Sequence, residues 1–243
     1  MDVSTIKKII EGSDNIVFFG GAGVSTESNI PDFRSAAGLY SSRYKSSFSP
    51  EEILSHDFFI NHTLEFYDFY KNKMIYKDAK PNKAHLALAK LEASGKLKAV
   101  ITQNIDGLHQ MAGSKKVLEL HGSIHRNYCM KCRSFYDLDH VLNSEGIPVC
   151  DKCRGIIKPD VVLYQESLDS SVLYEAINYI IDSDVLIVGG TSLTVYPAAG
   201  LVDYYRGNKL ILINRTPTTF DNSANYVHYG SIGEFLGQVV ELS

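Results

Sequence analysis

The sequence lacks any apolar run long enough to cross a membrane. A membrane-spanning helix takes about 18 or more consecutive apolar residues, and the apolar runs of this chain are far shorter. The N-terminal stretch also lacks the continuous apolar centre of a secretory signal, because Ile6, Ile9 and Ile10 are interspersed with lysine and glutamate. Residues 1–15 therefore predict a short amphipathic helix, and we expect a cytoplasmic protein with no membrane partner.

The chain also lacks an excess of positive charge. Its 24 lysine and arginine residues are outnumbered by 28 aspartate and glutamate residues, which gives a formal net charge of −4. Domains that bind nucleic acid usually carry a basic patch or stripe, so direct nucleic-acid binding is not expected. With 44% hydrophobic and 21% charged residues, the composition is that of an ordinary globular protein.

No cysteine lies outside two Cys-x-x-Cys pairs, which are Cys129 with Cys132 and Cys150 with Cys153. The 17 residues between the pairs match a common zinc-binding pattern; two redox dithiols or two disulfides are the alternatives. Four thiolates complete a tetrahedral zinc shell and leave no position for water or substrate. The predicted zinc is therefore structural, and it holds a ribbon of residues 122–157 that is too small for a core of its own.

Short apolar strands alternate with helical patterns over most of the chain. The predicted strands are residues 16–19, 97–101, 156–164, 185–188 and 210–213. This alternation predicts an α/β fold with a doubly wound, Rossmann-like parallel sheet. The parts of this sheet domain are residues 1–35, 80–121 and 158–243. Residues 36–79 lack the strand–helix repeat and include a strong helix start at Ser49-Pro50-Glu51-Glu52, so we interpret them as a small inserted helical module.

Two glycine turns follow predicted strands. Residues 20–26 read Gly-Gly-Ala-Gly-Val-Ser-Thr, and residues 189–193 read Gly-Gly-Thr-Ser-Leu. The first turn contains two glycines of a dinucleotide fingerprint but neither its third glycine nor a following strand with a ribose-binding acid. Taken alone it is either a tight turn or a variant nucleotide site. Because both turns and Asn214 end strands, they can converge on one long ligand such as a dinucleotide.

A polar stretch at residues 102–109 follows another predicted strand. Gln103, Asn104, Asp106 and the later His121 form a set that can orient a polar ligand and move one proton. The alternative is a polar loop with a hydrogen-bonded histidine. His85, on a neighbouring predicted helix, is more typical of a structural histidine than of a ligand.

Together these motifs resemble the sirtuin family. They are GAGVS at 21–25, IPDFR at 30–34, TQNIDGLH at 102–109, HG at 121–122, the four cysteines and GTSLTVYPA at 190–198. The resemblance implies a protein-lysine deacetylase that consumes NAD, with zinc as a structural metal and acetyl-lysine proteins or peptides as substrates. It places the NAD site at Ala22, Thr26, Phe33, Arg34, Gln103, Ile105, Asp106, His121, Thr191, Ser192, Asn214 and Ile232.

The resemblance also implies individual roles. Ile105 and Asp106 would face nicotinamide, Phe33 would shield the reacting ribose carbon, Asn104 would bind the ribose hydroxyls and His121 would be the catalytic base. The acyl-lysine oxygen would displace nicotinamide, and the acyl group would pass to the ribose 2′-hydroxyl. The substrate peptide would lie extended beside Val162, Tyr164 and Val195, pairing its main chain with residues 162–165 and 194–196. The alternatives are ADP-ribosyl transfer to protein, a longer-chain deacylase at the same NAD site, or a zinc-ribbon nucleic-acid adaptor.

The sequence departs from the family pattern at three places. Asn29 stands where glycine is usual, although asparagine tolerates a positive φ better than most residues. Tyr164-Gln165-Glu166 replaces Phe-Gly-Glu in the segment expected to clamp the peptide. The position of the Tyr-x-x-Arg motif of desuccinylating members reads Tyr67-Asp68-Phe69-Tyr70, without arginine. We therefore expect acetyl and other uncharged acyl groups to be preferred to succinyl.

Overall fold

A parallel sheet forms the larger part of the molecule. A computed structural model describes residues 2–33, 38 and 48–242. The larger sheet has six strands in the order β3-β2-β1-β7-β8-β9, and its neighbouring strands pair in parallel. These strands are β1 (Ile16–Gly20), β2 (Leu97–Thr102), β3 (Val117–Glu119), β7 (Val185–Gly189), β8 (Leu210–Asn214) and β9 (Tyr226–Tyr229). The sequence predicts a Rossmann-like parallel sheet but no strand order; the structure gives the order and adds β3 and β9.

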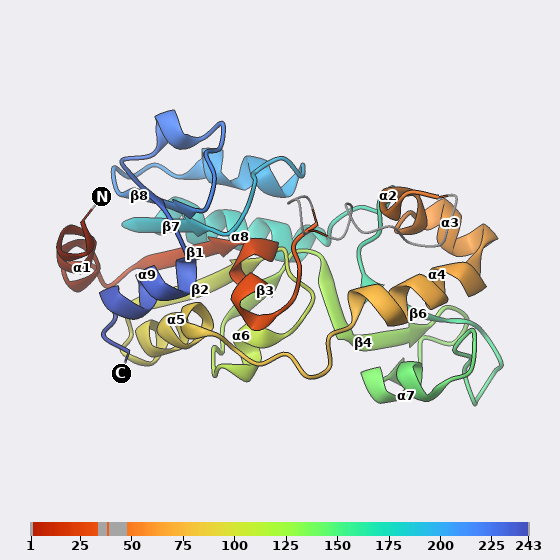
Figure 1. The fold of residues 1–243 in the computed structure, drawn as a ribbon. Coiled ribbons are helices and arrows are strands. Elements are labelled where there is room, and N and C mark those ends of the chain that lie inside the picture. The colour runs from red at the N-terminus through yellow and green to blue at the C-terminus, as the bar shows by residue number, and fades with distance from the viewer. Residues whose placement is uncertain (1, 34–37, 39–47, 243) are drawn as a thin grey trace.

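Helices cover both faces of this sheet (Figure 1). One face packs against α1 (Val3–Glu11), α5 (Lys83–Ala93) and α9 (Ile232–Val239), and the other against α8 (Ser170–Asp182) and the 3₁₀ segment η5 (Ala198–Tyr204). Neighbouring residues of β1 enter opposite cores, since Phe18 packs with the first group and Phe19 with the second. Burial on both faces explains why the strands read as continuous apolar runs rather than alternating ones.

A second, smaller unit contains a three-stranded antiparallel sheet in the order β5-β4-β6. Its strands are β4 (Gly122–Cys129), β5 (Phe135–Tyr136) and β6 (Ile157–Val161). Its helices are α2 (Pro50–Ile53), α3 (His56–Asn61), α4 (Thr63–Phe69), the π-helical turn η4 (Tyr70–Met74) and α7 (Leu138–Asn143). These elements share one aromatic-rich core, and Figure 1 shows them at one end of the molecule.

The sequence-based prediction assigned one strand, β6, to the wrong sheet. We expected residues 156–164 to return to the parallel sheet, whereas β6 pairs antiparallel with β4 in the small sheet. The cause is local: β4 and β6 flank the four-cysteine ribbon, so the ribbon brings them together. The division of the chain into three parts stays a prediction. These parts are a sheet domain of residues 1–35, 80–121 and 158–243, a helical module of residues 36–79, and a zinc ribbon of residues 122–157.

The helix starts follow the predicted local chemistry. Ser49 and Glu52 form a reciprocal capping box around Pro50 at the start of α2, and the Ser231 hydroxyl accepts from the Glu234 N–H at the start of α9. Each such cap contributes about 1 kcal/mol to helix stability. The N-terminal amphipathic helix is also present as α1. Among the described residues, no helix is long and apolar enough to cross a membrane.

Two buried histidines lie behind the sheet's polar edge. His85 on α5 and His109 on α6 (Leu108–Met111) have ring centroids 4.7 Å apart. Burial lowers the pKa of His85 to about 4 and that of His109 to about 3, so both are neutral at pH 7. His85 Nδ1 accepts the Asn82 N–H in the cap of α5. His85 is therefore structural, as expected.

Candidate active site between the two parts of the molecule

The two glycine turns pack directly against each other. The Gly23 N–H donates to Gly190 O at 2.8 Å, and the Gly190 N–H donates to Ile213 O at 3.0 Å. A Cβ atom at Gly23 would lie 2.8 Å from the Gly190 backbone, so the close approach requires glycine. After the first turn the chain forms two 3₁₀ turns, η1 (Ala22–Val24) and η2 (Thr26–Ser28), instead of a long helix.

Asn29 ends the second of these turns in a left-handed conformation. Its φ is 62° and its ψ is 23°, and its N–H donates to Thr26 O at 3.2 Å. Asparagine adopts this region more readily than most residues that carry a Cβ. The departure from glycine is therefore compatible with the loop.

A chain of hydrogen bonds joins residues at the carboxyl ends of three strands of the parallel sheet, β2, β7 and β8. Gln103 Nε2, after β2, donates to Thr191 Oγ1 at 3.1 Å, and the Thr191 N–H, after β7, donates to Asn214 Oδ1, at the end of β8, at 3.0 Å. Among the described residues, the buried Asn214 Nδ2 has no hydrogen-bond partner. An unpaired buried donor at this edge suits a ligand that brings an acceptor.

A second chain of hydrogen bonds is centred on Ser25. Asn104 Nδ2 donates to Ser25 Oγ at 3.1 Å, and Ser25 Oγ donates to Asp106 Oδ2 at 2.7 Å. The Leu108 N–H donates to the other Asp106 oxygen at 2.9 Å. Burial raises the pKa of Asp106, while the bonds from Leu108 and Ser25 act in the opposite direction. Sequence reasoning did not single out Ser25, although it lies in the GAGVS motif.

His121 is held in one tautomer. Its Nδ1 lies 2.9 Å from Gln103 O, and because a carbonyl oxygen only accepts, Nδ1 carries the hydrogen. In the neutral ring the free lone pair is then on Nε2. Burial lowers the pKa of His121, partly offset by the bond to Gln103. The imidazole is therefore a neutral base at pH 7.

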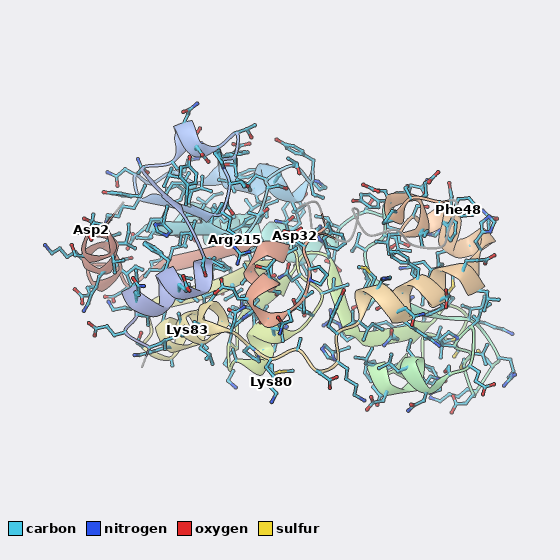
Figure 2. The ribbon with its side chains drawn as sticks, viewed as in Figure 1. Asp2, Asp32, Phe48, Lys80, Lys83 and Arg215 are labelled. Atoms are coloured by element: carbon cyan, nitrogen blue, oxygen red, sulfur yellow. The ribbon has the colours of Figure 1, made fainter. Side chains whose placement is uncertain are left out.

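A cavity of about 730 Å³ lies between the two parts of the molecule, within the usual size range of ligand pockets. Figure 2 labels Asp32 and Arg215, two of its lining residues, near the middle of the molecule. The cavity brings together every described residue that the sequence assigned to NAD or catalysis. They are Ala22, Thr26, Phe33, Gln103, Asn104, Ile105, Asp106, His121, Thr191, Ser192, Asn214 and Ile232. Arg34 lies outside the described residues.

The helical module contributes side chains to this cavity from its π-helical turn and nearby residues, not from Tyr67 and Tyr70. Tyr67 and Tyr70 are fully buried in the aromatic core, whereas Lys73 and Met74 of the π-helical turn reach the cavity together with Leu54 and Tyr76. A π turn is frequent at functional sites, but it has no sequence signature that would have identified it.

The residues expected to hold the peptide, Val162, Tyr164 and Val195, also line the cavity. Tyr164 is bound by its backbone to the helical module, since its N–H donates to Leu54 O at 3.0 Å and its carbonyl accepts from the His56 N–H at 2.9 Å. The main-chain groups of Tyr164 are therefore already paired. Pairing with an added peptide strand falls to other residues of the segment.

Gln165 has a left-handed backbone conformation, with a φ of 75°. Glycine adopts this conformation most readily, which explains why glycine is usual at this position in the family. Its side chain compensates by a reciprocal pair with Asp57: Oε1 accepts the Asp57 N–H, and Nε2 donates to Asp57 Oδ2, both at 3.0 Å. The glutamine thus attaches the peptide segment to α3, which a glycine could not do.

The four cysteines form one cluster. All their sulfur atoms lie within 4.8 Å of one another, with Cys129–Cys153 at 3.4 Å and Cys132–Cys150 at 3.6 Å. These distances are too long for disulfides and close to the edge of about 3.8 Å expected for a tetrahedron with Zn–S bonds of about 2.3 Å. Contacts between the two motifs also argue against two separate dithiols. The cluster fits a zinc ion.

Comparisons with known proteins agree with this geometry. A model of the Sir2 family matches residues 21–197. NAD-dependent protein deacetylases of Clostridium acetobutylicum and Clostridium tetani are 62% and 63% identical to the chain, over 98% and 97% of its length and 98% and 96% of theirs. A solved structure of Sir2 with a p53 peptide and NAD⁺ superposes with a TM-score of 0.86 at 41% identity, covering 99% of this chain and 98% of that one.

Proposed function

Since the chain belongs to the Sir2 family, we propose that its central cavity carries out NAD-dependent deacetylation of lysine in proteins or peptides. The observation that carries this proposal is the His121 imidazole, neutral and fixed to Gln103 O, on the wall of a cavity shared with Asn104 and Asp106. The products are the free lysine, nicotinamide and O-acetyl-ADP-ribose.

The residues present fit NAD. Both glycine turns line the cavity, and the unpaired Nδ2 of Asn214 offers a donor. We assign the ADP-ribose part to Ala22, Thr26, Phe33, Arg34, Gln103, Thr191, Ser192, Asn214 and Ile232, and the nicotinamide end to Ile105 and Asp106. NAD supplies the ribose that accepts the acetyl group.

The chain's own residues have three tasks. Asn104, tied to Ser25 Oγ, orients the ribose hydroxyls. His121 takes a proton from the ribose at Nε2, the nitrogen opposite its bond to Gln103. Phe33 and the other apolar groups of the wall keep water from the reacting carbon until the acyl transfer is complete.

The peptide lies in the cleft between Val162 and Tyr164 on one side and Val195 on the other. The Tyr164 backbone is committed to α2–α3, so we infer that Gln165 and residues 194–196 supply main-chain hydrogen bonds to an extended peptide. Such pairing reads little sequence. The four cysteines, clustered for one metal rather than paired in disulfides, support a reducing location, and we propose the cytoplasm.

The direct test is deacetylation of an acetyl-lysine peptide by the wild-type protein with and without NAD. We expect one nicotinamide and one O-acetyl-ADP-ribose for each lysine freed, measured by mass spectrometry, and no reaction without NAD. Loss of NAD with mass added to the protein target, and no free lysine, would instead show ADP-ribosyl transfer.

A second expectation concerns the acyl group. Tyr70, at the position of the desuccinylase arginine, is buried in the aromatic core, so no guanidinium there pairs a succinyl carboxylate. Because an unpaired charge in the cavity costs several kcal/mol, kcat/KM should be at least about tenfold higher for acetyl- than for succinyl-lysine peptide. Lys73 also lines the cavity and carries a positive charge that a succinyl carboxylate could pair with. The informative control is therefore Lys73→Met. If the wild type removes succinyl faster than acetyl and Lys73→Met does not, the expected acyl preference is wrong and Lys73 is the residue that pairs the succinyl carboxylate.

A further inference from the structure

His125 lies on the outer side of the turn that carries Asp106. It is an exposed residue of β4 and is not among the residues lining the central cavity. Its Nε2 lies 3.1 Å from Asp106 O. Since a carbonyl oxygen can only accept, Nε2 donates, in the neutral as in the protonated ring.

The turn leaves room for this ring because residue 107 is glycine. Gly107 has a φ of 74°, and a Cβ atom there would lie 2.8 Å from Cδ2 and Nε2 of His125. The imidazole therefore rests directly on the Gly107 backbone. A second bond lies beside it, since the Ile124 N–H donates to Ile105 O at 3.0 Å. Neighbouring residues of β4 thus hold both carbonyls of the Ile105–Asp106 pair.

The inner side of the same turn faces the central cavity. There the Asp106 carboxylate is held by Ser25 Oγ and by the Leu108 N–H. The side chain of Asp106 is thus fixed from within, and its backbone is fixed from outside by His125. Rotation of the peptide group after Asp106 would break the outer bond and release the backbone that carries this carboxylate.

We propose that His125 is a positioning residue that holds the Ile105–Gly107 turn in the orientation that binds nicotinamide. This inference rests on the proposed NAD-dependent function and names a determinant of how tightly the nicotinamide group is held. The affinity for free nicotinamide and for the nicotinamide end of NAD should depend on it, whereas the affinity for the peptide, which we place beside Val162, Tyr164 and Val195, should not.

The position is suited to substitution. His125 is exposed on the rim of a smaller outer cavity of about 390 Å³, which it shares with Leu108, Ile124 and Leu138. Removing its ring enlarges an existing hollow and opens no void in a core, so the variant should fold. Gln110, another exposed polar residue near the turn, bonds Glu119 instead and provides a matched control.

The experiment compares nicotinamide inhibition of deacetylation in the wild type, His125→Ala, His125→Gln and Gln110→Ala. Loss of one hydrogen bond should raise the inhibition constant for nicotinamide about fivefold in His125→Ala, with the KM for NAD rising in the same direction. The KM for peptide and the melting temperature should stay close to wild type. Gln110→Ala should behave as wild type, and His125→Gln, which keeps an N–H donor, should recover most of the affinity.

Two results would overturn the proposal. One is an unchanged inhibition constant in His125→Ala while the protein deacetylates normally with NAD. The other is an equal rise in every KM with a lowered melting temperature and no recovery by glutamine, which would show a merely structural role. If the wild type does not consume NAD, the proposed function fails as well, and the two failures are thereby distinguished.

Discussion

Replacing His121 by alanine is expected to lower the rate of deacetylation about 10²- to 10⁴-fold, the usual contribution of a positioned general base. His121 lines the central cavity and donates from Nδ1 to Gln103 O, so only Nε2 is available to accept a proton. No other imidazole lines the cavity among its described residues. The measurement is single-turnover release of O-acetyl-ADP-ribose from an acetyl-lysine peptide.

The same variant should separate the two stages of the reaction. Departure of nicotinamide needs no base, so exchange of labelled nicotinamide into NAD should persist in His121→Ala although deacetylation is lost. His62→Ala, a histidine of the helical module outside the cavity, should leave both rates unchanged. A His121→Ala protein that retains more than about a tenth of the deacetylation rate would assign the base elsewhere.

The pH profile gives an independent check on this assignment. Burial lowers the pKa of His121 from its ordinary value. The active, unprotonated form therefore predominates at neutral pH, and the acidic limb of kcat/KM should lie below about pH 6.5. The rate should fall as pH drops through the lowered pKa. An acidic limb centred well above neutrality would contradict the buried, neutral imidazole.

Much of the parallel sheet was predictable because its strands are buried on both faces. Such strands are continuous apolar runs, as residues 16–19 and 185–188 are, and a glycine turn follows each of these two where the chain leaves the core. The zinc cluster was predictable for a related reason, since the spacing of cysteines in a short ribbon is constrained by one metal. Ser49 and Ser231 marked their helices because capping is local chemistry.

The features that sequence reasoning missed depend on contacts between distant residues. β6 is amphipathic and carries no sign of its partner, which the ribbon supplies. Ser25 became notable only when Asn104 and Asp106 were found on either side of it. The Gln165–Asp57 pair joins residues that are 108 positions apart. Residue type and spacing alone therefore predicted which side chains line the cavity, but not the hydrogen bonds that orient them.

Removal of the metal is expected to have the second large effect, although the cluster contributes no group to the central cavity. Structural zinc binds such sites with about 10–16 kcal/mol, and two of the four cysteines, Cys129 and Cys150, are themselves buried in the aromatic core to which the ribbon contributes. Chelation, or Cys150→Ser at a fully buried sulfur, should therefore unfold the ribbon. The melting temperature should fall by at least about 10 °C, as for a loss of a few kcal/mol in a chain of this size.

Activity should be lost in the same protein, because β4 joins the cluster to the cavity. This strand contains Ile124, whose N–H donates to Ile105 O, and it ends at Cys129 in the cluster. Loss of structure in β4, starting at Cys129, would release the turn at Ile105–Asp106. Re-addition of zinc to the chelated wild type should restore both the melting temperature and deacetylation. Zinc content, melting temperature and rate should therefore change together in a titration with chelator. A metal-free protein with an unchanged melting temperature would show that β4 is held by the aromatic core alone, and that the cysteines serve another purpose.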